Sequence, residues 1–122
     1  MIPERHFAVW GWPAPVDLRK GFNGLLALVE GQWGHDLMRG DFYLFVARHR
    51  RSCKVLHYDG TGLCVLAKRL ATGQFARLWP DKPGEAIDSV LLTPSEYLLF
   101  MEGCEVVGRM ALSPPRQGRK AG

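Results

Sequence analysis

The sequence predicts an α+β fold in which a three- to four-stranded antiparallel β-meander is packed by one long N-terminal helix and a short C-terminal helix. Three observations predict it: apolar residues with helical spacing before residue 34, short apolar runs between turn signals over residues 41–79, and a helix start signal at residue 93. The 122 residues suffice for one domain with its own core. We expect that domain over residues 1–112 and a disordered basic tail over residues 113–122.

The long helix is predicted from a single apolar face. It should begin near Val16 or Asp17 and end at Gly34, a residue that commonly stops a helix. Its apolar residues recur with a period of about 3.6 residues and should pack on one face of the sheet. This stripe consists of Leu18, Phe22, Leu25, Leu26, Val29 and Trp33. Two glycines inside the helix, Gly21 and Gly24, each weaken it by ~1 kcal/mol relative to alanine.

The remaining elements follow from apolar runs, turns and a helix cap. Strands are expected over residues 6–10, 41–47, 53–58, 63–70 and 74–79, and a loop over residues 81–88. The strand at 41–47 does not alternate, so it should be covered on both faces. Residues 59–62, Asp-Gly-Thr-Gly, give a turn signal. Thr93 and Glu96 form a capping box around Pro94, which predicts a short helix that stops at Gly103.

Positive charge is concentrated in the strand region. Residues 48–77 contain seven Lys and Arg side chains and one acid, Asp59, a net charge of +6, whereas each flank sums to −1. Such an excess is typical of a surface that meets a polyanion, most often nucleic acid. The candidate nucleic-acid-binding residues here are Arg48, Arg50, Arg51, Lys54, Lys68, Arg69 and Arg77. Strand pairing should bring Lys54 and Lys68 onto one patch with the hairpin tip. The alternative is a tip charged for solubility and edge protection.

Aromatic side chains are interleaved with these cations. They are His49, His57, Tyr58 and Phe75, which could stack on unpaired bases. A second cationic site is predicted at the start of the long helix, where Arg19 and Lys20 would meet free backbone amides and favour a phosphate. The alternative for this site is a solvated helix face on which Asp17 pairs with Arg19 or Lys20.

Enzyme, metal and membrane signals do not occur in the sequence. It contains no HExxH, GxSxG, P-loop or GxGxxG pattern, and its three cysteines, Cys53, Cys64 and Cys104, form no CxxC pair. We therefore predict no catalytic residue, no cofactor and no metal. The longest apolar run is the six residues 42–47, against about 20 for a membrane helix, and the N-terminus lacks a secretory profile. A cytoplasmic protein is expected.

Three blocks of the sequence resemble one protein family. Residues 17–25 read DLRKGFNGL, residues 58–70 begin YDGTGL and end KRL, and residues 73–80 read GQFARLWP. The last block is followed by Leu-Thr at 92–93 and Glu-Gly at 102–103. These blocks are similar, over about residues 5–108 and in the same order, to the TnpB-type accessory protein of bacterial insertion sequences of the insertion-sequence-66 type. The resemblance implies a helper that assists transposition beside a separate, larger transposase and does not cut DNA itself.

Charge and resemblance together predict a non-enzymatic accessory factor in DNA transposition. It would bind nucleic acid through a basic β-hairpin surface, mainly at phosphates, and assist the transposase. Its partners would be DNA, at the element ends and with weak sequence preference, and the transposase. The alternative is a protein-interaction adaptor whose basic face docks on an acidic surface of the transposase without binding DNA. A third possibility, a nuclease, would require metal-dependent cleavage.

Overall fold

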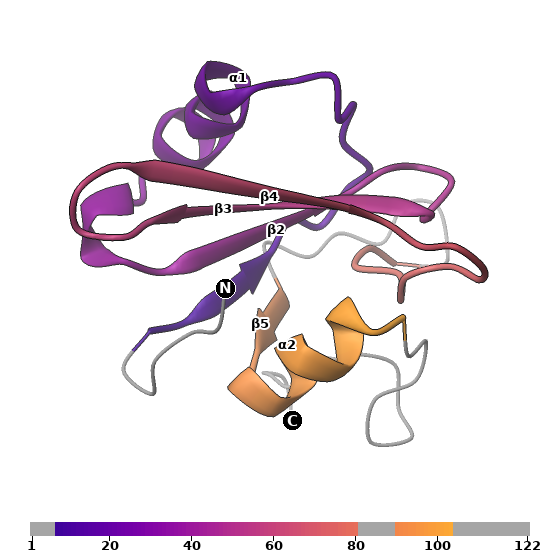
Figure 1. The fold of residues 1–122 in the computed structure, drawn as a ribbon. Helices are drawn as coiled ribbons and strands as arrows, with labels where there is room; N and C mark the ends of the chain where they lie inside the picture. Colours follow the sequence, from indigo (N-terminus) through magenta and orange to yellow (C-terminus); the bar gives the residue numbers. More distant parts are fainter. Residues whose placement is uncertain (1–6, 81–89, 104–122) are drawn as a thin grey trace.

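A five-stranded mixed sheet is the centre of the computed structural model, which describes residues 7–80 and 90–103 (Figure 1). The strands run in the order β4-β3-β2-β1-β5. β2 pairs antiparallel with β3, and β3 pairs antiparallel with β4, but β1 lies parallel to β2 and antiparallel to β5. The predicted antiparallel meander is therefore wrong. The strands are β1 (Val9–Gly11), β2 (Phe42–Val46), β3 (Ser52–Tyr58), β4 (Leu63–Arg69) and β5 (Val90–Leu92).

The sheet is mixed because the chain crosses over between β1 and β2. Parallel neighbours need a crossover connection, and residues 12–41 supply one whose helical turns pack on a face of the sheet. β5 was missed because three residues are too few to show an alternation. The strand predicted over residues 74–79 does not form; Phe75 and Leu78 are instead buried in the core. The loop predicted over residues 81–88 lies outside the described residues.

The N-terminal helix is much shorter than predicted. α1 spans Phe22–Leu26 and continues as the π-helix η1 (Ala27–Gln32), and the 3-10 helix η2 (Leu37–Arg39) follows. The N-cap is Gly21, which has no side chain to bind the free amides. The wider π turn also breaks the period on which the predicted stripe depended. Leu25 and Val29 are buried, whereas Phe22, the first residue of α1, is 50% exposed.

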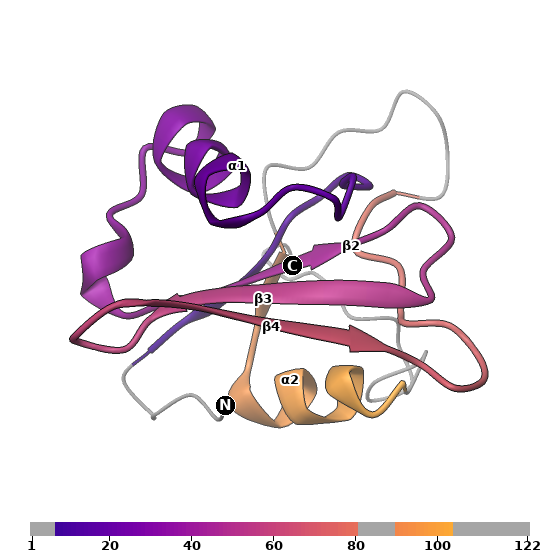
Figure 2. The same ribbon diagram turned by 45° about the horizontal axis from the view of Figure 1, so that its top comes forward.

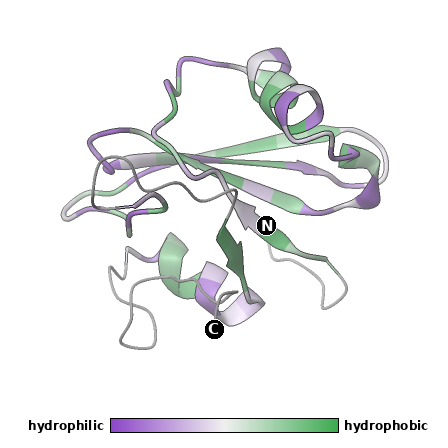
Figure 3. Ribbon diagram, turned by 180° about the vertical axis from the view of Figure 1, so that it is seen from behind, coloured by the Kyte–Doolittle hydropathy of each residue, from purple (hydrophilic) through white to green (hydrophobic). Residues whose placement is uncertain are grey.

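Each face of the sheet has its own hydrophobic core. α1 and η1 cover one face, and the helix α2 (Pro94–Met101) covers the other (Figure 2). β2 contributes to both cores, because its side chains alternate between the two faces of the sheet. Phe42, Leu44 and Val46 lie in the core between the sheet and α2, and Tyr43 and Phe45 lie in the core between the sheet and α1. All five are buried, which confirms that this strand is covered on both faces. Hydrophilic residues gather in the turns at the strand ends (Figure 3).

α2 begins and ends as predicted. The Thr93 hydroxyl accepts a hydrogen bond from the Glu96 amide at 3.1 Å, and the Glu96 carboxylate accepts one from the Thr93 amide at 2.8 Å. Pro94 occupies the first turn, where its missing amide proton costs nothing. Gly103, with φ of 86°, lies just after the helix in the conformation that glycine adopts most readily. Among the described residues, no helix has the length and apolarity needed to cross a membrane.

The Thr93 cap should be measurable in the stability of the whole fold. Thr93→Ala removes one of the two reciprocal hydrogen bonds and should lower the free energy of unfolding by about 1 kcal/mol. Urea denaturation followed by tryptophan fluorescence measures the change. Ser95→Ala, which alters an exposed hydroxyl in the same turn, is the control. Equal stability of the Thr93→Ala variant and the unmodified protein would contradict the prediction.

Candidate nucleic-acid interface

The turn between β2 and β3, residues 48–51, carries the densest positive charge, and we call it the basic tip. Hydrogen bonds from the Ala47 amide to the Ser52 carbonyl (3.1 Å) and from the Arg50 amide to the Ala47 carbonyl (2.8 Å) close this turn. Arg50 has a φ of 59°, in the left-handed region that non-glycine residues seldom occupy. The tip places three side chains in solvent, those of Arg48, His49 and Arg51.

Residues 70–75 run beside the basic tip and hold it against the domain. The Phe75 amide donates to the Arg50 carbonyl at 2.6 Å, and the Gln74 side chain donates to the His49 carbonyl at 3.0 Å. The Arg50 guanidinium donates in turn to the Phe75 carbonyl at 3.1 Å and to the Gln74 side-chain oxygen at 3.2 Å. The tip is therefore part of a double layer of chain, and Arg50 contributes to its folding.

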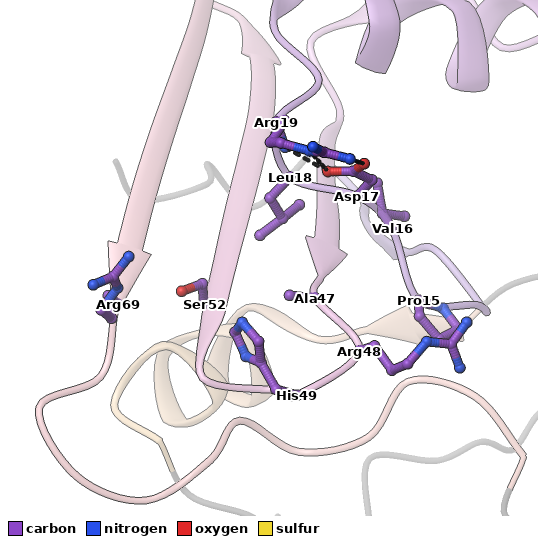
Figure 4. A pocket seen from close by; sticks show the side chains of 10 residues that line it. All are labelled: Pro15, Val16, Asp17, Leu18, Arg19, Ala47, Arg48, His49, Ser52 and Arg69. Atoms are coloured by element: carbon purple, nitrogen blue, oxygen red, sulfur yellow. Dashed lines mark hydrogen bonds and ion pairs between the residues drawn. The ribbon is translucent and has the colours of Figure 1, made fainter.

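Residues 12–16 bring a distant part of the sequence to this tip. The Trp12 amide donates to the Leu44 carbonyl at 2.9 Å, and the Val16 amide donates to the Val46 carbonyl at 3.0 Å. The chain thus follows β2 beyond the end of β1. The turn that comes next, residues 17–20, consequently lies beside the basic tip (Figure 4).

Asp17 and Arg19 form an ion pair within that turn. The Arg19 Nε donates to Oδ1 at 3.0 Å, and Nη2 donates to Oδ2 at 2.6 Å. These hydrogen bonds hold the pKa of the Asp17 carboxyl well below its usual range and raise the pKa of Arg19. The Asp17–Arg19 pair of the predicted alternative is present, but it lies in a turn and not on a helix face. The predicted helix start at these residues is wrong, because α1 begins only at Phe22, and phosphate binding by Arg19 and Lys20 stays a prediction.

Three adjoining hollows surround the start of β3, at Ser52. The largest, of about 540 Å³, is lined by residues 15–19, residues 47–49, Ser52 and Arg69, and we call it the basic groove (Figure 4). Two smaller hollows, of about 300 and 390 Å³, share Ser52 and Arg69 with it. One carboxylate, that of Asp17, lines the three hollows, against six cationic residues. These are Arg19, Arg48, Arg51, Lys54, Lys68 and Arg69.

Lys54 and Lys68 both line the hollow of about 300 Å³, but their side chains start from opposite faces of the sheet. Lys68 pairs across the strands with Cys53, so Lys54 lies on the opposite face of the sheet. The Lys68 ammonium donates to the Met101 carbonyl at 2.6 Å, at the C-terminal end of α2, where the helix dipole favours a cation. Lys54 donates to the Lys20 carbonyl at 3.0 Å. Both lysines thus have structural contacts.

Two of the aromatic residues expected to stack on bases lie in the core. The His57 ring stacks on Phe42 with centroids 3.9 Å apart, and Phe75 is fully buried. Burial also lowers the pKa of His57, which favours its neutral form. Of the four aromatic residues singled out, His49 alone lines the basic groove. Its Nδ1 accepts from the Arg51 amide at 3.0 Å, so the neutral ring carries its proton on Nε2.

The fold therefore brings together part of the predicted nucleic-acid-binding residues and adds uncharged residues that were not predicted. Arg19, Arg48, Arg51 and Arg69 surround the basic groove and its neighbour, whereas half-buried Arg77 lines none of the three hollows. Lys20 is exposed. The groove also has apolar lining residues that were missed, namely Pro15, Val16, Leu18 and Ala47. Nothing in their sequence pattern indicates a site, because the approach of residues 12–16 to β2 brings them there.

The turn between β3 and β4 is stabilised by one carboxylate. Asp59 accepts hydrogen bonds from the Thr61 amide, the Thr61 hydroxyl and the Gly62 amide at 2.9–3.0 Å. The hydrogen bonds, led by that of the Thr61 amide, lower the pKa of Asp59 to about 2. The Asp-Gly-Thr-Gly motif is thus a strand turn, and it lies at the opposite end of β3 from the basic tip.

No metal site is assembled from the described residues, and the two described cysteines are free thiols. In the ranges 7–80 and 90–103, no group of three His, Cys, Asp or Glu side chains could hold a metal ion. Cys53 is buried, which raises the pKa of its thiol to about 12. Cys64 donates to the Asp59 carboxylate at 3.4 Å and is a free thiol. Cys104 lies outside the described residues.

Comparisons with known proteins agree with the sequence blocks. The model of the family described as IS66 Orf2 like protein matches residues 7–110. The uncharacterized protein y4jC of Sinorhizobium fredii is 30% identical over 103 residues, which cover 84% of each chain. The uncharacterized protein y4hO of the same organism is 29% identical over 106 residues, covering 86% of this chain and 88% of the relative. No solved structure matches the chain.

Arg50 should matter for stability more than its exposed neighbours. Arg50→Ala removes two guanidinium hydrogen bonds and should lower the free energy of unfolding by about 1–2 kcal/mol. Arg50→Gly loses the same bonds but relaxes the left-handed backbone, so it should be less destabilising. Arg48→Ala, on the same turn, should change stability by less than about 0.5 kcal/mol. Urea denaturation ranks the three variants, and equal effects of Arg48→Ala and Arg50→Ala would refute this role.

Asp59 should make stability depend on acid pH. Its folded pKa of about 2 lies below the ordinary 3.8, so the charged carboxylate stabilises the fold above about pH 3.8. That contribution is lost as the pH falls through about 2. The difference in Tm between the unmodified protein and Asp59→Ala should therefore shrink over this interval, as measured by thermal denaturation. A difference that grows with acidification would have the wrong sign.

Proposed function

The chain belongs to the IS66 Orf2-like family, which is associated with transposition as an accessory of the transposase system, and on this premise we propose that it is a non-enzymatic DNA-binding factor. It binds DNA through the basic groove and the basic tip and assists a separate transposase. The catalytic chemistry belongs to the transposase. In the bacterial cytoplasm such a factor meets both partners directly.

One observation carries this proposal: cations from three segments converge on adjoining hollows that contain a single carboxylate. Arg48 comes from the basic tip, Arg69 from the end of β4, and Arg19 from the turn beside them. Within the described ranges, the ion pairs are Arg19–Asp17 and Arg39–Asp41, so Arg48, Arg51 and Arg69 have no carboxylate partner there. Unpaired guanidinium groups on a concave surface attract phosphates and bind them through paired N–H donors.

The longer helical segments carry no cations. α1, η1 and α2 contain no Lys or Arg, and the first two contribute Glu30 instead. Sequence recognition by an inserted helix needs base-contacting side chains on that helix. Contacts to phosphates alone position a protein without specifying a sequence. We therefore propose weak sequence preference, with specificity for the element ends supplied by the transposase.

Single charge removals at the tip should weaken DNA binding. Arg48→Ala and Arg51→Ala, made separately, should each raise the Kd and reduce the slope of log K against log salt by about 0.7–0.9 per lost phosphate contact. Fluorescence anisotropy with an element-end DNA and a shuffled DNA of equal length, titrated at several salt concentrations, measures both quantities. The two DNA sequences should bind alike.

The matched control is Arg39→Ala. The Arg39 side chain is 65% exposed and carries the same charge as the tip arginines. It lies before the start of β2, however, whereas the basic tip follows the end of β2. Its removal should leave the salt slope unchanged. Tip variants that bind like the control would refute the assignment of the tip. Absence of binding at low salt would refute the DNA-binding proposal and favour docking on an acidic transposase surface. Cleavage of the DNA in the presence of Mg²⁺ or Mn²⁺ would refute the non-enzymatic role.

A further inference from the structure

We propose that the basic groove binds single-stranded DNA, with an unpaired base inside the groove, in preference to the double helix. This inference rests on the proposed function and specifies the form of DNA that the site accepts. It follows from three features of the groove: an apolar centre, a flat exposed ion pair, and surroundings that do not project into a duplex groove.

The centre of the groove is apolar, although its rim is charged. Leu18 points into the space between the turn of residues 17–20 and the start of β3, with Ala47 beneath it and the basic tip below (Figure 4). A duplex presents phosphates and sugars to a concave surface, and neither gains from contact with a leucine. The face of an unpaired base does gain from such contact, because it is itself an apolar surface that stacking removes from water. The apolar centre thus fits a base, and the rim fits its phosphates.

The Asp17–Arg19 pair adds a flat surface at one wall of the groove. The Nε and Nη2 of Arg19 donate to the two carboxylate oxygens, so guanidinium and carboxylate are held together edge to edge. The edge of the guanidinium that would grip a phosphate is already used. Its face is free, since the Arg19 side chain is 91% exposed. Guanidinium planes stack on unpaired bases, and a fixed plane loses less entropy in doing so.

The rim of the groove supplies the phosphate contacts. Arg48 and Arg69 lie on opposite sides of His49 in the view of Figure 4, and no carboxylate among the described residues pairs with them. His49 offers an Nε2–H donor, because its Nδ1 accepts from the Arg51 amide. A strand that follows this rim can turn a base toward Leu18 while its phosphates remain with the arginines. The volume of about 540 Å³ lies within the range of small-ligand sites.

A duplex fits these surroundings less well. A two-stranded ribbon can enter a major groove when its tip projects. The basic tip does not project, because residues 70–75 are hydrogen-bonded along it through the Arg50 and His49 carbonyls. Neither α1, with five residues, nor α2 carries a cation. Residues 7–80 and 90–103 therefore present a concave charged surface with no cationic α-helix to insert.

The test compares two forms of DNA and one conservative variant. Fluorescence anisotropy should give a Kd for a short mixed-sequence strand that is about tenfold lower than that for its duplex at the same salt concentration. Arg19→Lys keeps the charge and the backbone hydrogen bond to Asp17 but loses the guanidinium plane. It should abolish most of this preference by weakening single-strand binding, with duplex binding unchanged. Arg39→Lys is the matched control and should change neither.

An abasic strand of the same length separates base contacts from charge. It carries the same phosphates, so the unmodified protein should bind it about as weakly as Arg19→Lys binds the normal strand. Equal affinity for the abasic and normal strands, or a duplex affinity equal to or above that of the strand, would overturn the single-strand inference while the proposed DNA binding stands. Failure to bind any of the three DNAs at low salt would overturn the proposed function itself.

Discussion

The parallel alignment of the N-terminal chain with β2 is the constraint on which the rest of the structure depends. β1 pairs with the first half of β2, and residues 12–16 continue along its second half through the amides of Trp12 and Val16. Because β2 is buried on both faces, this alignment cannot shift without exposing one of the two cores. The same hydrogen bonds determine that the Asp17–Arg19 turn lies beside the basic tip.

The basic region divides its cations between folding and solvent. Arg50 ties the tip to residues 70–75, and Lys68 binds the end of α2. Both side chains donate hydrogen bonds to neutral carbonyl oxygens. In the described part of the chain no carboxylate neutralises them, so each keeps its positive charge although its N–H donors are used. Arg48, Arg51 and Arg69 remain at the surface. A sequence with this much local positive charge needs such a division, because like charges with no structural partner would repel one another across the turn.

The family membership and the geometry of the site give two different kinds of information about function. The family match covers residues 7–110 and so includes every segment that builds the basic groove. Membership indicates a process, transposition, without indicating which surface acts. The geometry indicates a surface, because charge, an apolar centre and the flat Asp17–Arg19 pair occur in one concave place. Fold alone would not have indicated a function.

The local features of the fold follow from the amino-acid sequence alone. The buried strand β2, the turn at Asp59 and the capping box of α2 were predicted correctly. The turn and the capping box depend on neighbouring residues and short-range hydrogen bonds, and β2 is an uninterrupted apolar run in the sequence. The sequence also shows where the positive charge lies along the chain. Three features became visible only in the folded chain: the pairing of β1 with β2, the shortening of α1, and the separation of Lys54 from Lys68 onto opposite faces. These features depend on which distant backbone amides and carbonyls form hydrogen bonds with each other, and on the register in which two strands pair. A linear pattern of residues specifies neither.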